Sequence, residues 1–131
     1  MGVEFRLESD INSYSELMSM ITKDNNIKYD YNVYSIILNN RIIGYIIRYK
    51  VPANKSCYLD IFMLPDYRNR GYGSMSLSLF IDKFLLNYNE IYIRSNQINK
   101  NRFLINNNFK FIEENLNKNL YLRVLKYWKE V

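Results

Sequence analysis

Apolar and polar positions alternate with two different periods in the first part of the chain. Residues 3–7 alternate apolar and charged side chains, which is typical of a half-buried β-strand. Ser9 and Asp10 then offer capping side chains ahead of apolar residues at helical spacing, and this pattern predicts a helix through Ile21. The polar stretch 23–31 predicts a loop or a short second helix.

The next segment has the features of antiparallel strands. Residues 33–38 and 41–49 are rich in β-branched and aromatic side chains, and Asn39-Asn40 between them suits the positive φ angles of a tight hairpin turn. Gly44 inside the second strand indicates a bulge or a close backbone approach. Residues 52–55 predict a turn into a third strand at 57–64, which Pro65 ends.

Helical spacing returns over residues 71–88, where one wide stripe is apolar and predicts the main helix. The remaining pattern predicts a strand at 91–94, a helix at 100–105, strands at 109–113 and 120–126, and a turn at 115–119. Strands at this end leave a sheet edge that can pair with a second copy, so a homodimer is one expectation.

Length and composition limit the function classes. The chain has 131 residues, 48% hydrophobic and 24% charged, which predicts one compact domain over residues 1–131. The absence of histidine excludes Ser-His-Asp and Cys-His catalysis and an ordinary zinc site. Cys57 is the only cysteine, so no intramolecular disulfide forms, and we interpret it as a small core residue.

Charge and hydropathy address location and partners. The formal net charge is +5, but the basic residues are scattered, so nucleic-acid binding is not favoured. No window of 18 consecutive apolar residues exists, and the first residues resemble no signal peptide. The sequence therefore predicts a cytoplasmic protein with no membrane association.

The segment 64–74 carries the most informative chemistry. A strand end is followed by Arg68 and by two glycines, Gly71 and Gly73, that open the main helix. Glycines allow a ligand close to the backbone, and the first helical N–H groups have no partner within the helix, so the segment is suited to phosphate. No Walker A motif is present, and Ser76 stands where a dinucleotide fingerprint needs its third glycine. A tight turn into the helix is the alternative interpretation of the two glycines.

The spacing Arg68-x-x-Gly71-x-Gly73 between a strand and an amphipathic helix resembles the GNAT superfamily of N-acetyltransferases. Residues 42–46 are similar to that family's third strand, residues 62–65 to the end of its fourth, and Asn108-Phe109 to the Gly-Phe pair that opens its sixth. The resemblance implies an α/β fold with a mixed, mostly antiparallel central sheet flanked by helices, in which the two central strands splay apart.

The resemblance also implies a co-substrate, acetyl-CoA, and a site for it. Its pyrophosphate would bind the main-chain amides of residues 68–74, namely Arg68, Asn69, Arg70, Gly71, Tyr72, Gly73 and Ser74, with help from the Arg68 side chain. We interpret the Arg70 side chain as solvated. Main-chain groups around Ile61, Phe62 and Met63 would pair with the pantetheine arm. The implied activity is direct acetyl transfer to a primary amine of a small molecule or a peptide.

The catalytic groups are less legible. Asp60 is the candidate general base, and an edge or solvent-facing carboxylate is the alternative interpretation. Glu90, Tyr92 and Ser95 lie near the expected splay. The position at which many family members carry a proton-donating Tyr is Leu104 here, and the matching Asn position is Gln97. Two other functions stay open: an acyl-CoA-binding module without turnover, and a basic nucleic-acid adaptor.

Overall fold

The computed structural model describes residues 2–8, 31–50, 56–85, 87–88, 90–95, 98–115 and 118–124, with the side chains of 50, 94, 95, 98–101, 113–115 and 118–124 left aside. The helix predicted over 9–21, the turn at 52–55 and nearly all of the stretch 23–31 lie outside these residues. The elements are β1 (Glu4–Glu8), β2 (Tyr31–Leu38), β3 (Arg41–Lys50), β4 (Ser56–Met63), a 3-10 turn (Pro65–Tyr67), α2 (Tyr72–Phe84), β5 (Glu90–Ser95), α3 (Ile98–Asn106), β6 (Lys110–Asn115) and β7 (Lys118–Val124).

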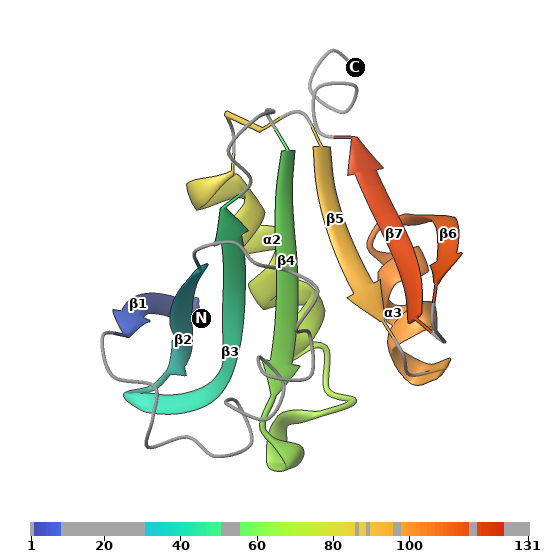
Figure 1. The fold of residues 1–131 in the computed structure, drawn as a ribbon. Helices are drawn as coiled ribbons and strands as arrows, with labels where there is room; N and C mark the ends of the chain where they lie inside the picture. Colours follow the sequence, from blue (N-terminus) through green and yellow to red (C-terminus); the bar gives the residue numbers. More distant parts are fainter. Residues whose placement is uncertain are drawn as a thin grey trace.

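These strands form one seven-stranded sheet in the order β1-β2-β3-β4-β5-β7-β6. All neighbouring pairs of described strands are antiparallel except β4 and β5, which run parallel. Parallel neighbours need a crossover, and α2 supplies it behind the sheet (Figure 1). The predicted mixed, mostly antiparallel sheet flanked by helices is confirmed.

The β2–β3 hairpin turns as its sequence predicts. Asn39 and Asn40 have φ angles of 51° and 65°, the left-handed region that a two-residue hairpin turn requires. The register shifts after Ile36, which pairs with Gly44, and this shift is a bulge. A Cβ on Gly44 would lie 2.5 Å from the carbonyl oxygen of Phe62. Both predicted reasons for this glycine, a bulge and a close approach, therefore apply.

Each face of the sheet buries its own apolar cluster. The larger cluster packs under α2 and α3, and its wholly buried members include Ile46, Leu77, Phe80 and Leu104. The smaller cluster lies on the opposite face, where Val33, Tyr45, Ile47 and Tyr49 are buried and Tyr58 and Phe62 pack against them. Strand residues alternate between the two clusters, as a pleated sheet with both faces covered requires.

Several element bounds differ from the sequence prediction, and the largest differences are at the end of α2 and at the β6–β7 turn. The main helix ends at Phe84 and not near residue 88, because Leu85 leaves the helical region at φ −116° and ψ 17° while its side chain stays buried. β6 extends through Asn115 and β7 starts at Lys118, so both strands take in parts of the predicted turn. The asparagines of 115–119 favour a turn, but the pairing of Asn115 with Lys118 extends both strands into that segment. Among the described helices, none has the length and hydropathy to cross a membrane.

Candidate functional site

The two central strands separate partway along their length. Within the described residues the β4–β5 ladder has four register pairs, from Ser56↔Glu90 to Leu59↔Ile93. Beyond that last pair β4 continues to Met63 and β5 continues to Ser95. Figure 1 shows the strands close together at one end and apart at the other. The predicted splay therefore starts immediately after Leu59, and Asp60 is the first β4 residue inside it.

The hydrogen-bond pattern shows which main-chain groups face the gap. The Leu64 amide donates to the Ile43 carbonyl at 2.8 Å, so even-numbered residues of β4 direct their polar groups toward β3. The main-chain groups of Ile61 and Met63 consequently point to the β5 side, whereas those of Phe62 point to β3. The structure thus divides the three residues named for the pantetheine arm. The main chain of Ile61 and Met63 faces the gap, where the Met63 carbonyl accepts a hydrogen bond from Arg68 Nε, and the main chain of Phe62 faces β3.

The loop after β4 brings the chain directly into α2. The 3-10 turn at Pro65–Tyr67 is closed by the Arg68 amide, which donates to the Pro65 carbonyl at 3.3 Å. Asn69 at φ 61° and Gly71 at φ 82° then reverse the backbone twice. Alternation of left-handed and ordinary residues directs successive amides into one concave surface, a geometry that binds anions.

The N-terminus of α2 opens at the same place. The first helical hydrogen bond runs from the Met75 amide to the Gly71 carbonyl, at 3.1 Å. The amides of Tyr72, Gly73 and Ser74 therefore precede the hydrogen-bonded part of the helix, and no side chain caps it. Uncapped amides at a helix N-terminus, together with the helix macrodipole, are suited to an anion, and the binding of pyrophosphate there stays a prediction.

The two glycines of the motif have different structural reasons. Gly71 has open space around a notional Cβ, but its φ of +82° disfavours any L side chain. At Gly73 a Cβ would lie 3.3 Å from Phe103 Cε1 and 3.6 Å from Met63 Cγ, so α3 and β4 approach the helix closely there. The tight turn is thus present at Gly71, the side chains of Phe103 and Met63 approach Gly73, and the close approach of a ligand to these glycines stays a prediction.

Several side chains around the loop bind to neighbouring main-chain groups and side chains. Arg68 Nε donates to the Met63 carbonyl at 2.9 Å, and its guanidinium lies 5.3 Å from the centre of the Phe62 ring. Arg70 is exposed, in agreement with a solvated role. Ser74 Oγ accepts a hydrogen bond from Asn107 Nδ2 at 3.0 Å, which fixes the first turn of α2 to the end of α3.

Leu104, at the position where many family members carry a proton-donating tyrosine, lies near the end of α3. Leu104 is wholly buried in the core, and its carbonyl accepts a hydrogen bond from the Phe109 amide at 3.0 Å. Asn108 takes φ 69°, the conformation that glycine usually supplies after a helix, and Phe109 is buried. The Tyr position is therefore a packing position in this chain, while Gln97 lies outside the described residues.

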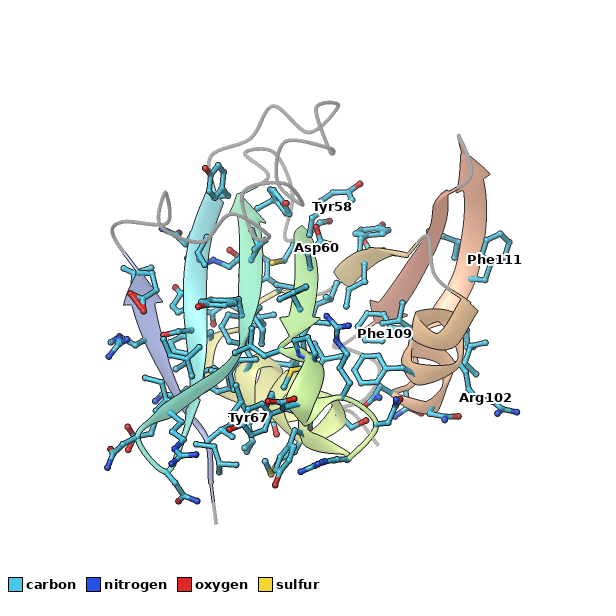
Figure 2. All side chains as sticks on the ribbon, turned by 90° about the horizontal axis from the view of Figure 1, so that it is seen from below. Tyr58, Asp60, Tyr67, Arg102, Phe109 and Phe111 are labelled. Atoms are coloured by element: carbon cyan, nitrogen blue, oxygen red, sulfur yellow. The ribbon has the colours of Figure 1, made fainter. Side chains whose placement is uncertain are left out.

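Asp60 sits at the vertex of the splay on the face opposite α2 (Figure 2). Its side chain is only 7% exposed, and its Oδ2 accepts a hydrogen bond from the Tyr49 hydroxyl at 3.2 Å. The solvent-facing alternative is therefore wrong: β4 is a central strand, and both of its faces are covered. Sequence reasoning missed Tyr49, because the alternating pattern gives each strand's faces but not the register that sets Tyr49 beside Asp60.

A second group of polar side chains lies before the vertex on that same face. The rings of Tyr58 and Tyr92 stack across β4 and β5, with centroids 5.1 Å apart and an interplanar angle of 22°. The Ser56 hydroxyl donates to Glu90 Oε1 at 3.4 Å. Partial burial, the charge of Glu90, Tyr58 and a hydrogen bond to Glu90 raise the pKa of Tyr92. Arg94 and Ser95 follow on β5, and their side chains lie outside the part of the chain that the structure describes.

Cys57 has no part in this chemistry. It is wholly buried under α2, and burial raises the pKa of its thiol to about 12, an effect that the charge of Arg48 only partly offsets. A protonated thiol in the core is unreactive, in agreement with the packing role predicted for it. In the part of the chain that the structure describes, no three His, Cys, Asp or Glu side chains gather as a metal site would need.

Comparisons with known proteins give one family and many related folds. The model of the acetyltransferase (GNAT) family matches residues 4–103. No curated protein matches the chain by sequence. Among solved structures, an acetyltransferase from Thermus thermophilus superposes with a TM-score of 0.75 at 12% identity, over 95% of this chain and 98% of that one.

Two further solved structures contain the co-substrate or its product. A Bacillus subtilis acetyltransferase in complex with CoA has a TM-score of 0.73 at 12% identity, over 94% of this chain and 99% of that one. The Campylobacter jejuni N-acetyltransferase PseH, in complex with acetyl coenzyme A, has a TM-score of 0.64 at 12% identity, over 93% of this chain and 99% of that one. At such identities the likeness concerns the fold.

Proposed function

Because this chain belongs to the acetyltransferase (GNAT) family, we propose that it transfers the acetyl group of acetyl-CoA directly to a primary amine. Acetyl-CoA is the co-substrate in this reaction, and the acceptor is a small molecule or a peptide amine. No covalent enzyme intermediate is required, because the amine itself is the nucleophile once it is deprotonated.

The residues of the loop and of β4 fit the two ends of the co-substrate. The concave run of amides that follows the Arg68–Pro65 hydrogen bond, from Asn69 to Ser74, suits a pyrophosphate, with the Arg68 side chain adding positive charge. Ile61 and Met63 direct main-chain groups toward the gap, as an amide-containing pantetheine arm needs. Loop and gap adjoin each other, since only Leu64 and the 3-10 turn separate Met63 from Arg68.

The reaction then requires that the acceptor amine lie beside the thioester and that it lose one proton. Acetyl-CoA supplies an activated thioester, whose carbonyl carbon is attacked by the acceptor nitrogen while coenzyme A leaves as the thiolate. Asp60 at the vertex accepts the proton that the nitrogen loses, and Tyr49 holds the Asp60 carboxylate by its hydrogen bond. With Leu104 buried, no tyrosine at that position protonates the thiolate. A thiol pKa of about 8.5 lets the thiolate leave unassisted or take a proton from water.

One observation carries this proposal: the β4–β5 ladder stops one residue before Asp60, at the end of β4 that leads into the amide loop. A buried carboxylate, the gap between β4 and β5, and the open N-terminus of α2 thus follow one another along the chain. Proximity and orientation of this kind provide a large part of the rate enhancement in bimolecular acyl transfer.

The test is acetyl-CoA-dependent release of thiol with a panel of primary amines, together with calorimetry of coenzyme A binding. We expect coenzyme A binding in the wild type and turnover with at least one amine, and Asp60→Asn should lower kcat/KM about 100-fold without changing coenzyme A affinity. Asp82→Asn, an exposed carboxylate on α2, is the matched control. Absence of coenzyme A binding would remove the whole proposal.

The burial of Leu104 favours a second candidate, a module of the same family that binds acyl-CoA without turnover. The two functions differ in a single readout. Tight binding of acetyl-CoA with no thiol release from any amine, at any pH between 6 and 9, would select the binding module over the enzyme.

A further inference from the structure

The Tyr58–Tyr92 pair and Glu90 form a second recognition element beside the vertex. Glu90, Tyr92 and Tyr58 share the sheet face of Asp60, because Tyr58 pairs with Tyr92 in parallel register and alternate residues of a strand share a face. Asp60 follows Tyr58 by two residues, and Glu90 precedes Tyr92 by two. An aromatic pair thus lies between two carboxylates along the β4–β5 seam.

Resting on the function proposed above, we infer that this element binds a second positive charge of the acceptor, so that the preferred substrate is a short diamine or a polyamine. Stacked tyrosine faces attract ammonium groups, and an adjacent carboxylate adds charge attraction. Tyr58 precedes Asp60 by two strand residues, or about 7 Å, so an ammonium group on the tyrosine pair would lie about that far from the reacting nitrogen, with Glu90 two residues further along the β4–β5 pair. This is the scale of a diaminobutane or diaminopentane.

The state of these side chains agrees with a ligand-binding role. Tyr58, Tyr92 and Glu90 are all half-buried, so they are ordered by neighbours and still accessible. Glu90 is held by the Ser56 hydroxyl and by Tyr92, whose pKa is raised by burial and by the Glu90 charge. The phenol therefore stays neutral, and Glu90 supplies the negative charge of the element. An aliphatic monoamine would bring no positive charge to Glu90, which would keep only its hydrogen bonds to Ser56 and Tyr92.

Three acceptors of nearly equal shape test the inference: 1,5-diaminopentane, 5-amino-1-pentanol and 5-aminopentanoate. Their distal groups are positive, neutral and negative, while the reacting amine is the same. We expect kcat/KM for the diamine to exceed that for the amino alcohol by about 10-fold, with the amino acid poorer still. Equal values for the three acceptors would overturn the inference and leave the acetyltransferase proposal intact.

Two substitutions test whether the preference for the diamine depends on Glu90 and Tyr92. Glu90→Gln and Tyr92→Leu should each bring the diamine to within about twofold of the amino alcohol, with unchanged coenzyme A affinity, whereas Asp82→Asn should keep the full preference. A preference that survives both substitutions would place the second charge elsewhere and overturn the inference.

A binding experiment keeps the inference testable if turnover is absent. Calorimetry with coenzyme A present should show diamine binding that Glu90→Gln weakens about 10-fold, even in a protein that acetylates nothing. That result would support the second-charge element while the enzyme proposal fails. No diamine binding and no diamine turnover would overturn the inference.

Discussion

The Tyr49 hydroxyl donates a hydrogen bond to Asp60 Oδ2 at 3.2 Å, across the β3–β4 pair in the interior of the sheet face opposite α2. Both side chains are buried, so solvent screens this hydrogen bond little. A hydrogen bond to the charged form of a carboxyl group stabilises that form. Tyr49 is therefore a positioning residue for the candidate base.

Tyr49→Phe tests this relationship through the pH–rate profile. Without the hydroxyl the Asp60 carboxylate takes up a proton more readily, so the acidic limb of the profile should move to higher pH and the rate at pH 6 should fall about 5- to 10-fold. Tyr88→Phe, half-buried and packed against the core under α2, is the matched control. A variant that melts lower but keeps the wild-type profile would reduce Tyr49 to a structural residue.

Gly71→Ala tests the anion-binding loop. An L side chain at φ +82° costs about 1–2 kcal/mol, and relief of that strain would turn the amides of the loop away from their common direction. We expect coenzyme A to bind roughly 10-fold more weakly by calorimetry. Gly71→Asn should lose less, because asparagine tolerates the left-handed region. Equal coenzyme A affinity in folded wild type and Gly71→Ala would show that the loop does not bind the pyrophosphate.

Gly44→Ala tests the close approach of β3 and β4. The added methyl would lie 2.5 Å from the Phe62 carbonyl oxygen and 2.9 Å from Met63 Sδ, so the strands must separate. The free energy of unfolding in urea should fall by about 2–3 kcal/mol. Gly2→Ala is the control, because nothing lies within 4 Å of its notional Cβ. An unchanged free energy of unfolding in Gly44→Ala would show that β3 and β4 can separate at this position at no cost, which would contradict the prediction.

Cys57 predicts a dependence of stability on alkaline pH. The folded thiol titrates with a pKa of about 12, and an exposed thiol titrates near 9.0, so the unfolded chain ionises first as pH rises. The stabilisation is complete below pH 9 and is lost progressively between pH 9 and 12, by about 2 kcal/mol at pH 10.5. Urea unfolding of Cys57→Ala should lack this part of the pH dependence. Parallel curves for the two proteins would contradict the buried, protonated thiol.

The features that sequence reasoning predicted correctly are those with local causes. The Asn39-Asn40 turn depends on neighbouring residues and on few conformations. The close approach at Gly44 involves Phe62 and Met63 of β4, and it was predictable because a glycine inside a strand is itself a signal of such an approach. The path from β4 through the glycines into α2 is equally local. Helix ends and the β6–β7 turn were displaced by a few residues, because helix ends fray and because cross-strand pairing prevails over the turn preference of asparagine between β6 and β7.

The features that depend on register were not predictable from the pattern. The Tyr49–Asp60 hydrogen bond and the Tyr58–Tyr92 stack both join residues of different strands, at distances set by pairing and by the bulge after Ile36. One sequence does not state which rungs pair, and a shift by one residue would exchange the faces. The same limit explains why Phe62 was grouped with Ile61 and Met63 although its main chain faces β3.

The four register pairs between β4 and β5 also join two antiparallel parts of the sheet, β1–β4 and β5–β7. On one face the core under α2 runs across the β4–β5 seam without interruption, from Leu59 to Ile93. On the other face the described links are a ring stack and the Ser56–Glu90 hydrogen bond. Flexing should therefore hinge on the α2 side and open toward the tyrosines.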